Sequence, residues 1–76
     1  MEQQGFISAL RDLLDEYENG EGIMSQEYVI ESARELKDDM LPANSVLKTY
    51  LDDAFNEYNK SKDEVAMMAE LITTVQ

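Results

Sequence analysis

The stretch LKTYLDDAFNEY, residues 47–58, carries the clearest structural pattern in the chain. Its apolar side chains recur at steps of three and four residues, which places them along one side of an α-helix. Asn44 or Ser45 is suited to cap the first turn of this helix. Asn59-Lys60 predicts a short break after it. The stretch therefore predicts an amphipathic helix, and the rest of the chain repeats its pattern.

The same periodicity predicts two helices before this stretch. One runs roughly over residues 4–18, and the sequence NGEG at 19–22 ends it, because glycine favours the left-handed conformation that follows a helix end. The other begins at a Ser25 cap and ends near Met40, since Pro42 disfavours helical conformation in the residue before it.

A last helix is predicted to run to about Thr74. Ser61 and Glu64 have the spacing of a capping box at its start. Its apolar stripe consists of Val65, Met68, Leu71, Ile72 and Val75. Met67 lies outside this stripe and widens the apolar arc to about 160–200°, compared with the usual stripe of about 100°. Such a helix is either central in the bundle or shared with a second molecule. The predicted seam of a homodimer consists of Met67, Met68, Leu71 and Ile72.

Four helices joined by short loops predict a small all-α bundle that forms one domain over residues 1–76. The chain has 17 acidic and 6 basic residues, which give a formal net charge of -11. A high net charge favours disorder, but 43% of the residues are apolar and they are periodic. We therefore expect a folded domain whose stability is limited by self-repulsion.

The composition excludes several classes of function. A pI near 4.1 argues against direct binding of nucleic acid and of anionic membranes. With no His and no Cys, the chain lacks the usual general base and the usual transition-metal ligands, and no cofactor is expected. No stretch is long and apolar enough to span a membrane, and the N-terminus lacks the features of a signal peptide. A cytoplasmic location is the resulting expectation.

Candidate chemistry was tested at the acidic residues. The acidic glycine loop over residues 15–27 is similar to an EF-hand loop, but every register leaves at least two positions without the required residue. Adjacent carboxylates such as Asp52 and Asp53 point in different directions on a helix, so they do not share a proton. The sequence contains no nucleotide-binding or hydrolase motif. A non-enzymatic protein is therefore predicted.

An acidic row follows the second predicted helix. Glu27, Glu31 and Glu35 recur every four residues, and Asp38 continues the same side. The row lies opposite the apolar stripe of this helix, which consists of Val29, Ala33, Leu36 and Met40. A merely solvated face is the alternative, although such faces usually mix both signs of charge. Tyr28 lies beside the row and suits a contact with a partner. Further acids assigned to the same partner-binding face are Asp12, Asp15, Glu16, Glu18 and Glu21.

The leading hypothesis is an acidic protein that inhibits a nucleic-acid-binding protein by occupying its basic site. Arginine binds carboxylates and phosphates alike, so a row of carboxylates can take the place of a nucleic-acid backbone. In size and charge the chain is similar to the small acidic helical inhibitors that phages and mobile elements encode. That resemblance implies a DNA mimic that acts in host takeover.

Two alternatives remain open. The first is a helical adaptor or structural protein that acts through the apolar seam on the fourth helix. The second is a carrier protein, because Ser45 at the start of the third helix and the C-terminal string ITTVQ are similar to acyl carrier proteins. That resemblance implies phosphopantetheine on Ser45, although the family's Asp-Ser-Leu motif reads Asn-Ser-Val here. A plain capping role is the simpler expectation for this serine.

Overall fold

Four α-helices make up nearly all of the computed structural model, which describes residues 2–20 and 24–76. The predicted all-α bundle is confirmed for these residues. The predicted ends of the second helix are confirmed, and the first helix extends slightly beyond its predicted range at both ends. The helices are α1 (Glu2–Asn19), α2 (Gln26–Met40), α3 (Val46–Ser61) and α4 (Glu64–Val75).

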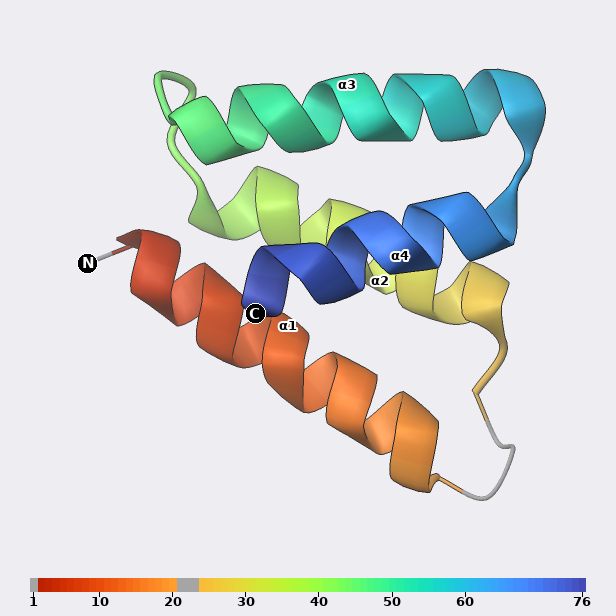
Figure 1. Cartoon of the computed structure of the whole chain (residues 1–76). Coiled ribbons are helices and arrows are strands. Elements are labelled where there is room, and N and C mark those ends of the chain that lie inside the picture. The colour runs from red at the N-terminus through yellow and green to blue at the C-terminus, as the bar shows by residue number, and fades with distance from the viewer. Residues whose placement is uncertain (1, 21–23) are drawn as a thin grey trace.

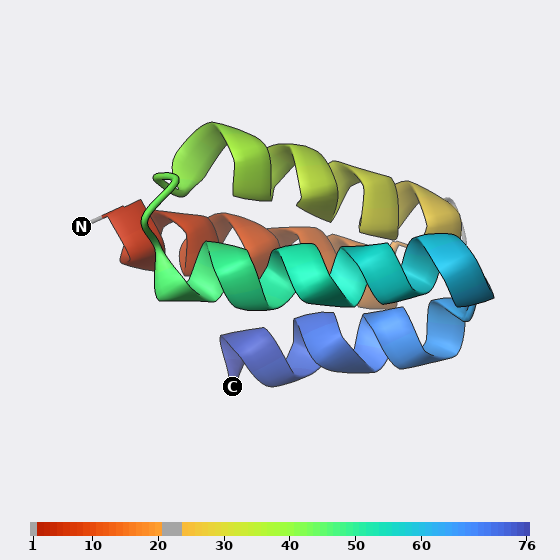
Figure 2. The same cartoon turned by 90° about the horizontal axis from the view of Figure 1, so that it is seen from above.

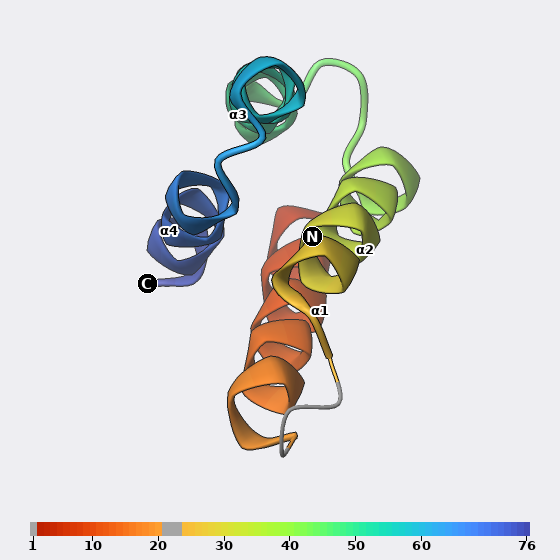
Figure 3. The same cartoon turned by 90° about the vertical axis from the view of Figure 1, so that its right-hand side faces the viewer.

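Successive helices run in opposite directions (Figures 1 and 2). Viewed end-on, they occupy the four corners of a flattened bundle, with α1 and α3 on opposite corners (Figure 3). The remaining diagonal is the short one, because α4 contacts α2 as well as α1 and α3. The bundle measures 36 × 28 × 19 Å. Both α2 and α4 therefore hold central positions, since each packs against all three other helices.

The core draws side chains from every helix. The apolar stripes predicted for α1 and α3 are buried or half-buried except at Tyr50, which is 48% exposed. On α2 the buried side is wider than predicted, because it also takes in Ile30 and Lys37. The largest fully buried side chains are Phe6, Leu10, Val29, Ile30, Leu51 and Leu71.

The buried side of α4 differs from its predicted stripe. Val65, expected in the stripe, is 71% exposed, whereas Met67, expected outside it, is 2% exposed. Met68 and Leu71 are also buried, so the chain's own helices cover three of the four predicted seam residues. Only Ile72, at 36% exposed, remains accessible to a partner. The central position of α4 thus explains the burial of Met67, Met68 and Leu71, whereas Val65 and Ile72 stay exposed, and dimerisation stays a prediction.

Side-chain caps begin α2 and α3 as the sequence indicates. The Ser25 hydroxyl accepts a hydrogen bond from the Tyr28 N–H at 3.1 Å, and the Ser45 hydroxyl accepts one from the Lys48 N–H at 3.2 Å. Gly20 follows α1, where an added Cβ would clash with the carbonyl oxygen of Glu16. The two serine hydrogen bonds satisfy backbone N–H groups that the start of a helix leaves unpaired.

The connection from α3 to α4 corrects two predictions. No break occurs at residues 59–60, since α3 continues to Ser61. The cap of α4 is Asp63 rather than Ser61, and its carboxylate accepts the Ala66 N–H at 3.1 Å. The chain turns instead at Lys62, which is left-handed (φ 56°, ψ 29°) and donates its N–H to the Tyr58 carbonyl at 2.7 Å. Because Ser61 is the last residue of α3, it does not cap α4.

Replacing Lys62 tests this left-handed cap. Lys62→Gly and Lys62→Ala both remove the ammonium that lies 5.6 Å from the centre of the Tyr58 ring. Only glycine takes the left-handed conformation without a steric penalty from Cβ. We therefore expect the glycine variant to be more stable than the alanine variant by about 1 kcal/mol in urea unfolding. Equal stabilities would show that the turn does not depend on this conformation.

Candidate functional site

The α2 acidic row lies on the surface, as the helical period predicts. Val29 and Ala33 anchor the opposite side of α2 in the core, and this packing fixes the direction of the row. The Ser25 cap holds the first turn in place next to Glu27, near the positive end of the helix dipole. The row's four carboxylates, all exposed, are Glu27, Glu31, Glu35 and Asp38.

Bases neutralise only part of this row. Glu31 forms an ion pair with Arg34 at 3.2 Å, and Arg34 also donates to the Asn59 side chain at 2.9 Å. The same guanidinium lies 5.3 Å from the centre of the Phe55 ring, so it is held against α3. Within the described residues, Glu27 and Glu35 have no base within ion-pair distance. The two therefore present uncompensated negative charge.

Asp38 belongs to a charged link between α2 and α3. Lys37, only 5% exposed, lies 3.0 Å from Asp38 and donates a hydrogen bond to Asp52. Lys48 lies 3.6 Å from Asp38 and 3.7 Å from Asp52. Lys37 also lies 5.2 Å from the centre of the Phe55 ring. Asp38 is thus paired with two lysines, so it adds little uncompensated negative charge to the row.

The pKa values of this link follow from its contacts. Burial by itself lowers the pKa of Lys37, but its hydrogen bonds to Asp52 and Asp38 outweigh that effect and raise the pKa overall. The hydrogen bond from Lys37 lowers the pKa of Asp38. Both side chains therefore stay charged at neutral pH. Sequence reasoning missed the burial of Lys37, because helical position alone does not show that partners on α3 receive the ammonium.

The acids of α1 divide between different sides of their helix. Those assigned to the partner-binding face, Asp12, Asp15, Glu16 and Glu18, are all exposed. Arg11 donates to the Val75 carbonyl at 2.8 Å, and Asp15 and Glu18 share its side of α1 by their spacing of four and seven residues. These two acids thus lie on the Arg11 side of α1, on another side than Asp12 and Glu16. Glu21 lies outside the described residues.

Two tyrosines lie near the row in different environments. Tyr28 is 56% exposed, so its predicted availability for a contact agrees with its position. Tyr58 is buried on α3, and its pKa is raised by burial and by the negative charges of Glu64, Glu27 and Glu31. The field of the α2 acidic row therefore reaches the neighbouring helix.

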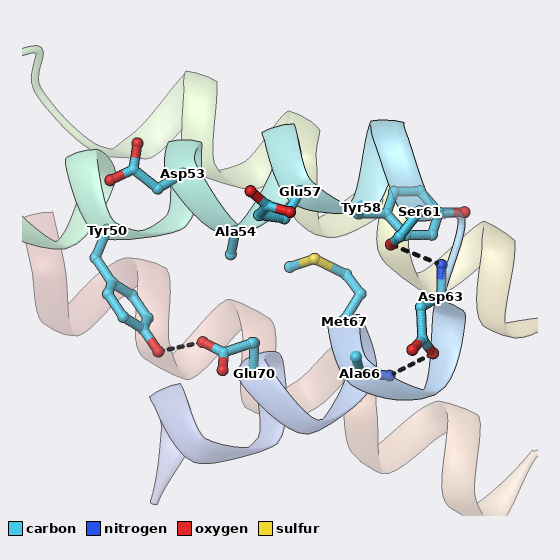
Figure 4. A pocket seen from close by; sticks show the side chains of 10 residues that line it. All are labelled: Tyr50, Asp53, Ala54, Glu57, Tyr58, Ser61, Asp63, Ala66, Met67 and Glu70. Atoms are coloured by element: carbon cyan, nitrogen blue, oxygen red, sulfur yellow. Dashed lines mark hydrogen bonds between the residues drawn. The ribbon is translucent and has the colours of Figure 1, made fainter.

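A groove between α3 and α4 was not predicted from the sequence (Figure 4). Its volume is about 460 Å³, and Ala54 and Met67 point into it. The Tyr50 hydroxyl donates to the Glu70 carboxylate across one end, and this hydrogen bond raises the pKa of Tyr50. The residues that line this α3–α4 groove are Tyr50, Asp53, Ala54, Glu57, Tyr58, Ser61, Asp63, Ala66, Met67 and Glu70.

A sequence signal for the groove exists in retrospect. Asp53 and Glu57 form a second acidic pair at a spacing of four residues, on the exposed side of α3. Ala54 on α3 and Ala66 on α4 are small, and small side chains between two helices leave space. Only the pairing of the two helices reveals that these features meet.

Two further kinds of site, a metal site and the carrier-protein serine, can be compared with the described residues. No three acidic side chains there are placed to hold a metal ion. The hydroxyl of Ser45, the residue of the carrier-protein alternative, serves as the cap of α3.

None of the helices described is both long and apolar enough to cross a membrane.

Comparison of the chain with protein-family models, with curated proteins and with solved structures finds no significant match in any of the three. The candidate site therefore rests on the geometry and charge of this chain's own residues.

Asp38 and Asp39 offer a matched test of the link between α2 and α3. Both are exposed in the last turn of α2, where a negative charge opposes the helix dipole, but only Asp38 is paired with lysines. We expect Asp38→Asn to be less stable than Asp39→Asn by about 0.5–1 kcal/mol in urea unfolding at neutral pH.

The pH dependence of this difference has a defined sign. The pKa of Asp38 is lowered in the folded state from its ordinary value of 3.8. The paired carboxylate therefore stabilises the fold above that value, and the stabilisation is lost as the pH falls through the folded-state pKa. Unfolding measured along an acid series should show the two variants converge. A gap that persists at the acid end would contradict the assigned pairing.

Proposed function

We propose that this chain is a non-enzymatic acidic protein that binds the basic surface of a nucleic-acid-binding protein and competes with the nucleic acid. The observation that carries the proposal is the pair Glu27 and Glu35, exposed on one helix with Glu31 between them. Neither has a base within ion-pair distance in the part of the chain that the structure describes. A surface of this kind is complementary to a site built from arginine and lysine.

The use of the bases within the fold supports this proposal. Arg11 holds the end of α4, Arg34 and Lys37 reach α3, and Lys48 reaches back to Asp38 on α2. These four bases are occupied between helices, and among the described residues only Glu31, Asp38 and Asp52 have a base within ion-pair distance. With a net charge of -11, the resulting field speeds association with a basic partner.

The spacing of the row defines what it resembles. Successive carboxylates rise about 6 Å along the helix axis, whereas duplex DNA presents one charge per about 1.7 Å. The α2 acidic row therefore substitutes for selected phosphates rather than for the full charge density of a duplex. Asp15 and Glu18 share the Arg11 side of α1, so we assign Asp12 and Glu16, on another side, as the acids of α1 that extend the row. A competitor of this kind would act in the cytoplasm, in the manner of a phage or mobile-element inhibitor.

Competition with DNA is the direct test of this proposal. The immobilised protein would be exposed to a cell lysate and eluted with duplex DNA or with an equal mass of neutral dextran. We expect DNA alone to release a basic nucleic-acid-binding protein, which mass spectrometry would identify. That protein, purified, should lose its DNA in a gel-shift assay when the acidic chain is added. A purified partner that binds DNA and this chain simultaneously would exclude the proposal.

Two charge-matched variants then assign the surface. Glu27→Gln/Glu35→Gln and Asp15→Asn/Glu18→Gln each remove two negative charges from exposed helix positions. We expect the α2 pair to weaken binding to the captured partner about tenfold and the α1 pair less than about threefold, because close charge pairs dominate over the general field. Fluorescence anisotropy measures the affinities, and circular dichroism checks the helix content. Equal losses would mean that only the overall charge is recognised.

A further inference from the structure

The solvent-facing side of α4 is apolar in a highly charged protein. Charged residues make up 30% of the chain, yet α4 carries only Glu64 and Glu70. Its exposed positions include Val65, at 71% exposed, and Ile72, at 36% exposed. Ala66 and Ala69 lie between them and are also exposed. This strip borders the α3–α4 groove through Ala66, which lines it.

The groove itself combines an apolar floor with an acidic rim. Ala54 and Met67 point into it, and Met67 is itself buried in the bundle (Figure 4). Asp53 and Glu57 stand on the α3 side, exposed and without a base within ion-pair distance among the described residues. One base is near, since the Lys62 ammonium lies over the ring of Tyr58 at one end. The rim therefore stays predominantly acidic.

We propose that the α3–α4 groove and the adjoining apolar strip of α4 bind a basic amphipathic helix of a partner protein. Apolar side chains of that helix would enter the groove above Ala54 and Met67, and its lysines or arginines would meet Asp53 and Glu57. Ala66 and Ala69 allow a close approach of its backbone. Helices with an apolar and a charged side bind hydrophobic grooves in this way.

Charge decides between this occupant and a second copy of the chain. Two copies would each bring a net charge of -11 and would set acidic rims against one another. Juxtaposed like charges disfavour such a pairing, whereas a basic helix gains from the same rim. A volume of about 460 Å³ also accommodates large apolar side chains. The inference uses α3 and α4 and is independent of the α2 acidic row.

A synthetic peptide provides the test. The probe is an amphipathic helix of leucine and lysine of about 18 residues, or roughly 27 Å when helical. Its control has the same composition in an order that destroys the apolar side. Titration of the ¹⁵N-labelled protein should shift the amide signals of residues 50–70 most strongly for the amphipathic probe. Shifts centred on α1 and α2, or equal affinity for both peptides, would overturn the proposal.

Substitutions sharpen the result. Asp53→Asn/Glu57→Gln should weaken probe binding about tenfold, the value expected for the loss of two ion pairs. The control variant Glu27→Gln/Glu35→Gln has the same change in charge and should weaken probe binding less than about threefold. Ala66→Phe fills the groove from an exposed position and should weaken binding without changing the net charge. Circular dichroism confirms folding of each variant.

The remaining outcomes separate this proposal from others. Equal losses from both charge variants would assign the peptide to the general field and refute the groove. If sedimentation shows a dimer in the absence of peptide, and if residues 65–72 form its interface, the strip would be assigned to a second copy. Failure of the DNA-competition test leaves these measurements unaffected, since they depend on different helices.

Discussion

Lys37 connects α2 to α3 from a nearly buried position, and the bundle depends on this connection. Burying an ammonium is costly unless it is paired, and here Asp52, Asp38 and the ring of Phe55 offset the loss of water. A chain with a net charge of -11 needs such attractive links to oppose its own repulsion. Arg34 also connects α2 to α3, and Arg11 connects α1 to the end of α4. The surface is acidic because 17 acidic residues outnumber 6 basic ones, and four of these bases are engaged between helices.

Much of this fold follows from the sequence, since four amphipathic periods suffice to predict four helices. The predictions that fail concern side chains whose position is determined by contacts with another helix. Lys37 reads as polar in α2 and is buried because its partners lie on α3. Ser61 and Asp63 are both competent caps, and the left-handed turn at Lys62 determines which of them begins α4. Local propensity leaves such choices open, and tertiary contacts decide them.

The candidate site was predictable to a similar degree. Exposure of the α2 acidic row follows from the helical period and the apolar stripe opposite it. The pairing of Asp38 with Lys48 and the contact of Arg11 with the end of α4 depend on neighbouring helices, so the sequence could not supply them. The α3–α4 groove is a feature of two helices together. Ala54 and Ala66 make space only because α3 and α4 lie side by side (Figures 1 and 3).

The two surfaces differ in the physics of recognition. The α2 acidic row offers charge alone, so its contacts weaken as salt shortens the screening length to about 8 Å at physiological ionic strength. The α3–α4 groove adds burial of apolar area, which salt does not screen. A partner that used both surfaces would approach through the long-range field and be retained by the groove. The negative charge that the proposed basic partner would complement also disfavours contact between copies of this chain. A high net charge and an exposed apolar strip are therefore compatible in one small protein.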